Sequence, residues 1–187
     1  EYLFAVWWAG GAVVPMNTRW SAAENAYSLN DSGAQVLFLD RNFVPMLDAI
    51  RAEAKGVDTI IYMGDDPAPE GMLSFEELIA QNQPCDDAMR TDEDLAGLFY
   101  TGGTTGFPKG VMLSHRALWY NAMAISKELR LGRDTKYLHV APMFHLADFG
   151  FNTAIAMVGG CNVYIPSFEP EATMAAIEVQ EVNTLLL

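Results

Sequence analysis

The chain has 187 residues, 51% of them hydrophobic, with 24 Asp and Glu residues against 11 Lys and Arg residues. This length and hydrophobic content are enough to build a buried core, which excludes a disordered chain. The excess of acidic groups repels nucleic-acid backbones and anionic membrane surfaces, so a nucleic-acid partner is not expected.

The first apolar stretch, residues 2–15, stops at Pro15 and is shorter than the ~20 residues that a membrane-spanning helix needs. We interpret it as a buried helix that runs into a buried strand. The chain begins inside this helical pattern and ends on an apolar run, so we expect it to be a piece of a longer chain. Cys85 and Cys161 lack metal-ligand spacing, which favours a reducing, cytoplasmic setting.

Short β-rich runs alternate with helical patterns along the whole chain. The expected strands cover residues 11–17, 34–40, 58–63, 95–101, 136–142, 161–166 and 184–187. Most of them are continuous apolar runs, as in strands that are covered on both faces. The alternation predicts the α/β class, with mixed, largely parallel sheets covered by helices.

Helix signals stand between these strands. Ser21 with Glu24, and Ser74 with Glu77, have capping-box spacing. Apolar residues at helical spacing predict further helices around residues 43–50 and 118–129. Between them, Pro and acidic residues replace the periodic pattern, so we divide the chain into a first lobe, residues 1–90, and a second lobe, residues 91–187.

The stretch YTGGTTGFPKG, residues 100–110, follows an apolar strand, at the kind of strand end where ligands of α/β proteins lie. Its glycines permit positive φ and let successive amides turn toward one anion. Its threonines add hydroxyl donors, and its lysine adds a positive charge. The candidate ligand-binding residues are Thr101, Gly102, Gly103, Thr104, Thr105, Gly106 and Lys109. The stretch therefore predicts a loop that binds a polyphosphate.

The charge distribution agrees with an anion at this loop. Residues 95–127 contain no Asp or Glu, where an even spread of the chain's 24 acidic residues would place about four. The same window holds Lys109, Arg116 and Lys127. Residues 86–94, directly before it, contain five acidic side chains.

Two other interpretations of the loop compete with this one. A Walker P-loop requires Gly before its lysine and Ser or Thr after it, whereas Pro108 and Gly110 stand at those positions, which disfavours a P-loop hydrolase. A glycine-rich hairpin turn without a ligand needs one or two glycines but has no use for three threonines and a lysine.

The stretch YTGGTTGFPKGVMLSH, residues 100–115, resembles the phosphate-loop signature of the adenylate-forming enzymes, which include acyl-CoA synthetases, luciferases and peptide-synthetase adenylation domains. Residues 11–20 and 140–150 resemble two further stretches of that family, in the same order. The resemblance implies part of the large N-terminal domain of such an enzyme, without its small C-terminal domain.

The resemblance also implies a reaction, in which a carboxylate attacks the α-phosphate of ATP, pyrophosphate leaves, and coenzyme A takes the acyl group. Thr101 and residues 104–106 would contact phosphate, and Lys109 would approach the departing pyrophosphate. Thr101 is also the candidate contact for Mg²⁺. Donors and cations of this kind lower the barrier by neutralising charge and aligning the reactants.

The histidines differ in their surroundings. We expect His115 to cap or flank a helix and His139 to be a packed, hydrogen-bonded core residue. His145 lies beyond a strand end, on the sheet edge expected for the loop. The resemblance implies that its side chain lines the substrate site and orients the substrate carboxylate. It is not expected to act as a general base, because a carboxylate is already ionised at neutral pH. Phe149 is a candidate for the acyl pocket, although Gly150 comes later after the histidine than in the family.

The sequence thus favours an AMP-forming acyl-CoA synthetase for a small-molecule carboxylic acid, with a fatty acid as the preferred class and ATP, Mg²⁺ and coenzyme A as cofactors. An aryl-acid CoA ligase and an amino-acid adenylation domain remain open within the family. The 187-residue piece is expected to be inactive alone. A non-catalytic nucleotide- or pyrophosphate-binding module is the alternative from another class, and a homodimer is an open oligomeric state.

Overall fold

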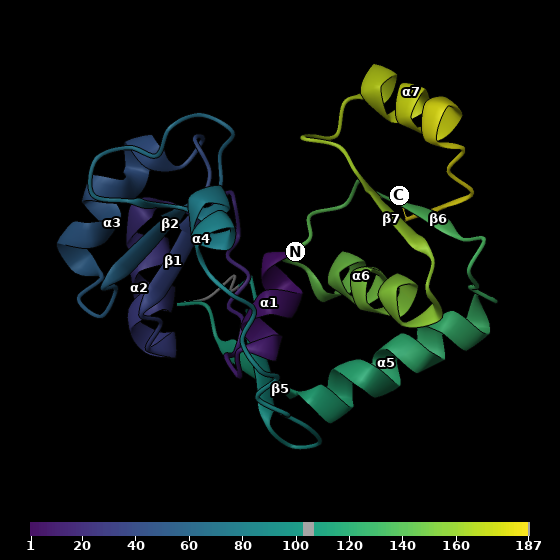
Figure 1. Ribbon diagram of the computed structural model, residues 1–187, viewed down its shortest axis with the longest axis horizontal. Coiled ribbons are helices and arrows are strands. Elements are labelled where there is room, and N and C mark those ends of the chain that lie inside the picture. The colour runs from purple at the N-terminus through teal and green to yellow at the C-terminus, as the bar shows by residue number, and fades with distance from the viewer. Residues whose placement is uncertain (103–106, 187) are drawn as a thin grey trace. The chain divides into compact units, whose positions relative to one another are not determined.

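A computed structural model describes residues 1–102 and 107–186. The chain divides into two compact units, Glu1–Ala88 with Tyr100–Val111, and Met89–Phe99 with Met112–Leu187. These units differ from the expected lobes in two segments, because residues 89–90 group with the second unit and residues 100–111 group with the first. Figure 1 shows the elements of each unit, and they are described below one unit at a time.

The first unit is built around a parallel sheet. Its elements are α1 (Tyr2–Trp8), α2 (Ala22–Ser32), β1 (Val36–Leu39), η1 (Val44–Met46), α3 (Leu47–Glu53), β2 (Thr59–Tyr62), β3 (Leu73–Ser74) and α4 (Phe75–Gln81). The sheet order is β1-β2-β3, with Val36 opposite Thr59 and Leu39 opposite Tyr62. Successive side chains of a strand point to opposite faces, so each of these strands can pack on two layers.

Helices α2 and α3 cover one face of this sheet. The buried side chains of this layer are Ala26, Leu29, Leu37, Leu39, Leu47, Ile50, Ala54, Ile60 and Tyr62. Phe38 alternates to the other face, where its ring lies 5.5 Å from that of Tyr2 and 6.3 Å from that of Phe75, between ring centroids. Helices α1 and α4 therefore contact the second face.

The second unit has a helix on each face of a parallel sheet, as Figure 1 shows for α6 and α7. Its elements are α5 (His115–Glu128), β6 (Lys136–His139), α6 (Leu146–Val158), β7 (Cys161–Tyr164), α7 (Pro170–Gln180) and β8 (Thr184–Leu185). The sheet order is β7-β6-β8, with β6 parallel to both neighbours. Helix α5 packs along α6, and the central strand β6 buries Tyr137 and Leu138 completely.

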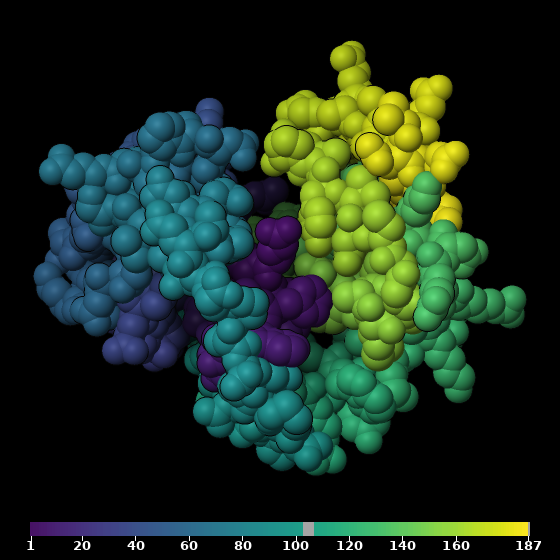
Figure 2. All heavy atoms as spheres, viewed as in Figure 1, coloured from purple at the N-terminus to yellow at the C-terminus, as the bar shows by residue number. Residues whose placement is uncertain are grey.

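The strands β4 (Leu95–Tyr100) and β5 (Gly110–Ser114) pair with each other and flank the glycine- and threonine-rich loop. Residues 79–93, which precede β4, are exposed throughout, and teal spheres of this part of the chain lie on the viewed surface in Figure 2. The loop thus begins at a strand end, as predicted.

The α/β class with parallel sheets is confirmed. Strands β1, β2, β4, β6, β7 and β8 lie inside predicted runs. The capping box of Ser21 and Glu24 is formed, and Ser74 accepts from the amide of Glu77. The expected helix around residues 118–129 is α5, which begins at His115.

Two expectations about the elements are wrong. Residues 11–17 form no strand and contain a single bridge at Val13, because Pro15 has no amide hydrogen to pair. Leu3 is the buried residue of α1, whereas Phe4, Ala5 and Trp8 are exposed, so this helix is not buried as a whole. The short strands β3 and β5 were not predicted. None of the described helices is long and apolar enough to cross a membrane.

Candidate active site

The described ends of the loop are held together at its base. The Thr101 amide donates to the Lys109 carbonyl over 3.0 Å, and the Thr101 hydroxyl lies 3.5 Å from the same oxygen. Thr101, Gly102 and Lys109 are exposed. The base of the loop therefore exposes the Thr101 side chain, the Gly102 backbone and the Lys109 ammonium group to a ligand.

Several predicted residues of the loop, Gly103, Thr104, Thr105 and Gly106, lie outside the described residues, so their roles stay predictions. Gly102 can be assessed. Its backbone does not adopt a positive φ, and a Cβ built on it would meet no atom of the described residues within 4 Å. Positive φ, which glycine permits, is thus not used at Gly102, and the role of this residue in binding phosphate stays a prediction.

The charges around the loop differ in one respect from the sequence prediction. Arg116 binds the acidic segment before β4, with its Nε 2.7 Å from Glu93 and a terminal nitrogen 3.2 Å from Asp92. Among the described ion pairs none involves Lys109. Arg116 is thus occupied by carboxylates, and Lys109 is the cation of the loop that an anion can reach.

His145 stands at the start of α6, where it is the N-cap residue and makes no side-chain cap hydrogen bond. Its backbone amide donates to the Pro142 carbonyl over 3.0 Å, and its carbonyl accepts from Phe149, which fixes the backbone of this turn. The imidazole is exposed and lies beside the Phe144 ring at 4.3 Å between centroids. The side chain is therefore accessible to a ligand from a fixed position.

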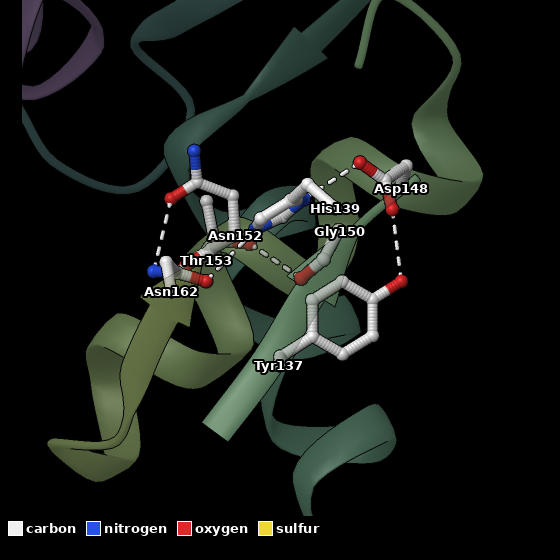
Figure 3. Close-up of polar contacts among 7 residues, drawn as sticks. All are labelled: Tyr137, His139, Asp148, Gly150, Asn152, Thr153 and Asn162. Atoms are coloured by element: carbon white, nitrogen blue, oxygen red, sulfur yellow. Dashed lines mark hydrogen bonds and ion pairs between the residues drawn. The ribbon is translucent and has the colours of Figure 1, made fainter. Parts of the chain in front are cut away.

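His139 is a core histidine, as predicted, and Figure 3 shows the polar network around it. Its Nδ1 lies 2.6 Å from Asp148 Oδ2, and its Nε2 lies 2.9 Å from Asn162 Oδ1. The Tyr137 hydroxyl donates to Asp148 Oδ1 over 2.8 Å. Burial and this hydrogen bond raise the pKa of the Tyr137 phenol well above its ordinary value, so it remains a donor.

Asp148 was missed as a candidate, although the sequence offered a signal: an acid one helical turn after His145 within an apolar stretch. It is fully buried and has its two oxygens bound by side chains of β6. A buried carboxylate is stable only when its oxygens are hydrogen-bonded or paired. The hydrogen bonds of Asp148 hold the first turn of α6, which follows His145, against the central strand β6.

Phe149 is 2% exposed and its ring meets that of Phe99 edge-on at 4.8 Å between centroids. Gly150 is buried where α6 approaches α5, and a Cβ there would lie 2.8 Å from Asn121 Oδ1 and 3.1 Å from Ile125 Cδ1. This glycine therefore serves helix packing. A place for Phe149 in an acyl pocket stays a prediction.

The loop is described within the first unit, and His145 and Phe149 are described within the second. A shared cavity for the loop and His145 therefore stays a prediction. Among the residues with described positions, no group of three or more His, Cys, Asp or Glu side chains could hold a metal ion.

Several known proteins are similar to this chain in sequence and in fold. A long-chain-fatty-acid–CoA ligase of Thermus thermophilus is 40% identical over 87% of this chain and 30% of its own length. The N-terminal domain of FACL13 from Mycobacterium tuberculosis, solved with an inhibitor, superposes with a TM-score of 0.86 at 27% identity, over 98% of this chain and 45% of that one. ATP-bound MatB from Rhodopseudomonas palustris has a TM-score of 0.80 at 26% identity, over 98% of this chain and 35% of that one.

The names of the matching curated relatives include CoA ligases for 4-hydroxybutyrate, indoleacetate and long-chain fatty acids. This chain spans about a third of the length of those relatives. The family model described as "AMP-binding enzyme" matches residues 1–187. The chain therefore belongs to the AMP-binding enzyme family.

Proposed function

We propose that this chain is part of an AMP-forming acyl-CoA synthetase that activates a carboxylic acid. The observation behind the proposal is the loop, whose base is closed by the Thr101–Lys109 hydrogen bond and whose lysine is exposed and outside the described ion pairs. Amide, hydroxyl and ammonium donors at one loop suit the phosphates of ATP.

The reaction has two steps. A carboxylate oxygen of the acid forms a bond to the α-phosphorus of ATP, and the bond from that phosphorus to the bridging oxygen breaks, which releases pyrophosphate. The coenzyme A sulfur then bonds to the acyl carbon and AMP leaves, while the thiol proton passes to solvent or a base. Both partners of the first step are anions, so donors that neutralise the leaving pyrophosphate lower its barrier.

Lys109 is the residue proposed to meet the departing pyrophosphate. Its ammonium group is a mobile point charge on a flexible stem, which suits a group that gains charge and then leaves. Thr101, Gly102 and the residues 103–106 are proposed to bind the phosphates through amide and hydroxyl hydrogens. These short-range contacts hold ATP in line for attack.

Mg²⁺ is proposed to arrive with the nucleotide. Thr101 is exposed and neutral, and no described cluster of carboxylates or histidines surrounds it. Such a donor set fits Mg²⁺, which keeps several waters and binds through few protein ligands and the substrate's phosphates. When bound, the ion supplies charge neutralisation to the phosphate oxygens.

His145 is proposed to orient the carboxylate of the acid. An exposed imidazole on a fixed helix start can donate a hydrogen bond to a carboxylate without removing a proton from it. A fatty acid is the proposed substrate class, and aryl acids and amino acids are the alternatives. Free, exposed Cys85 and Cys161 suit a cytoplasmic enzyme.

The test is exchange of labelled pyrophosphate into ATP by the full-length protein, with palmitate, benzoate or alanine as the added acid. Exchange that depends on palmitate is the expected result, and dependence on benzoate or alanine would point to the other substrate classes. Exchange without any acid, or hydrolysis of ATP to phosphate, would contradict the proposal. The isolated 187-residue chain should show no exchange.

A further inference from the structure

Both described flanks of the loop contact the same helix, α2. On one side, the hydroxyl of Tyr100 donates to Asp31 Oδ2 over 2.7 Å, with the Ser28 carbonyl at 3.3 Å. On the other side, the ring of Phe107 stacks on Tyr27, with centroids 4.6 Å apart and planes at 24°. Tyr27 and Asp31 are four residues apart, so they share one face of α2.

These contacts are unusual for the positions at which they occur. Phe107 is 71% exposed, so burial in a core does not explain its aromatic ring, whereas the stack on Tyr27 does. Asp31 lies in the last turn of α2, which contains no basic residue, and an acid is disfavoured there by the helix dipole. The Tyr100 hydroxyl supplies the hydrogen-bond donor that this carboxylate lacks within its own helix.

The Tyr100 ring is held from further sides. Trp20 meets it edge-on, with centroids 6.1 Å apart. A Cβ built on Gly110 would lie only 3.0 Å from Tyr100 Cζ, so glycine at this position leaves room for the ring. Burial and the hydrogen bond to Asp31 raise the pKa of the Tyr100 phenol, which therefore stays a donor at neutral pH. Tyr100 directly precedes Thr101.

Helix α2 is a suitable support because its ends and its other face are fixed. The capping box of Ser21 and Glu24 begins the helix, and Gly33 ends it in the left-handed conformation with φ of 69°. Ala26 and Leu29, on a different face from Tyr27, are 1% and 2% exposed in the core of the first unit. A residue that is bound to α2 is therefore held in a fixed position relative to the sheet of the first unit.

We propose that α2 is the platform that positions the phosphate loop, with Tyr27 and Asp31 as positioning residues that act through Phe107 and Tyr100. The proposal rests on the proposed function of the loop. Two attachment points, one before Thr101 and one before Lys109, fix the base of the loop against rotation about either strand. In-line displacement is sensitive to small shifts of the groups that hold the reactants, so loss of one attachment slows adenylation.

The test separates the two half-reactions in the full-length protein. Adenylation is measured as palmitate-dependent exchange of labelled pyrophosphate into ATP, over a range of ATP concentrations. Thioester formation is measured from supplied palmitoyl-adenylate and coenzyme A, a step in which no pyrophosphate takes part. Tyr27→Ala removes the stack, and Tyr27→Phe retains it. Phe75→Ala is the matched control, since Phe75 is a half-buried partner in an aromatic pair with Phe38, on the other face of the same sheet.

Tyr27→Ala should lower kcat/KM for ATP in exchange by more than twofold and by up to about twelvefold, the upper end that follows from loss of one aromatic pair. Thioester formation should stay within about twofold of wild type. Tyr27→Phe and Phe75→Ala should leave both steps within about twofold. Asp31→Ala should repeat the loss, and Asp31→Asn, which keeps an acceptor oxygen, should recover it in part.

Equal losses in both half-reactions would overturn the proposal, because they would indicate a general effect on folding. Unchanged exchange in both Tyr27→Ala and Asp31→Ala, with an active wild type, would overturn it as well. A wild-type protein without acid-dependent exchange would instead contradict the proposed function itself.

Discussion

Replacement of Asp148 should destabilise the second unit more than any surface change. Its carboxylate is fully buried and accepts from Tyr137 over 2.8 Å and pairs with His139 at 2.6 Å. In Asp148→Ala, a phenol and an imidazole lose their acceptor inside the core, at about 1–3 kcal/mol for each unsatisfied group. We therefore expect a loss of about 4 kcal/mol in unfolding free energy. Asp148→Asn keeps one acceptor oxygen and should lose about half as much.

Urea denaturation followed by circular dichroism measures these losses, and hydrogen exchange of the β6 amides locates them in the second unit. Glu178→Ala, an exposed acid on α7, is the control and should change stability by less than about 0.5 kcal/mol. A loss in Asp148→Ala that matches this control would refute the reasoning.

A double replacement tests whether the loss comes from unsatisfied partners. In His139→Leu/Asp148→Leu, the buried imidazole and carboxylate are removed together, so neither of these two groups is left without the other, and the Tyr137 hydroxyl loses its acceptor just as it does in Asp148→Leu alone. The double variant should be more stable than the sum of the two single losses predicts, by about 1–3 kcal/mol. Simple additivity would show that His139 and Asp148 do not depend on each other.

Three further predictions concern other parts of the chain. Lys109→Ala should slow adenylate formation about 100-fold, which is the usual effect of removing a donor to a developing charge. Thioester formation from a supplied adenylate should stay nearly unchanged, and equal losses in both steps would contradict the proposed contact of Lys109 with pyrophosphate. The hydrogen bond from Tyr62 lowers the pKa of Asp66, so this carboxylate stabilises the fold above its ordinary pKa and the effect is lost as pH falls through the lowered value. Melting temperatures of wild type and Asp66→Asn should therefore differ at pH 7 and converge as the pH falls through the lowered pKa of Asp66, and a constant difference would argue against this contribution. Gly150→Ala places a Cβ 2.8 Å from Asn121 Oδ1 and should lower the unfolding free energy by about 1–3 kcal/mol in the same urea assay. An unchanged unfolding midpoint would show that α5 and α6 can move apart without cost.

Local patterns in the sequence were sufficient for the elements that depend on local physics. The strands β1, β2, β6 and β7 lie inside the runs that the sequence marked as strands, and the alternation of strands and helices predicted that the sheets are largely parallel. The capping box of Ser21 and Glu24 uses side chains three residues apart, so sequence spacing alone identifies it.

The failures concern features that depend on partners elsewhere in the chain. Residues 11–17 have the composition of a strand, but a strand requires a neighbour to pair with, and Pro15 removes one donor. The strand β5 begins with glycine and has exposed side chains at Val111 and Met112, so its composition gives little signal and its pairing with β4 defines it. The burial of Asp148 depends on two side chains of β6, which no spacing within α6 reveals.

The loop illustrates the same limit. Its residue types predicted a phosphate ligand, but the residues that hold its base, Tyr27 and Asp31, lie about 70 positions earlier in the chain. Nothing in the sequence around them marks this contact. Arg116, which the charge count assigned to the anion, is instead bound to Asp92 and Glu93, because the acidic segment lies against the start of α5.

The net charge of −13 repels a polyphosphate at long range, so the proposed binding of ATP has to overcome this repulsion. At an ionic strength near 0.1 M, charges more than about 10 Å apart are largely screened, whereas hydrogen-bond donors act at about 3 Å. Binding must therefore come from donors placed close to the phosphates, and a neutral amide or hydroxyl serves only if its position is fixed. Under the proposed function, the contacts that hold the loop base on α2 therefore matter more for nucleotide binding than the overall charge does.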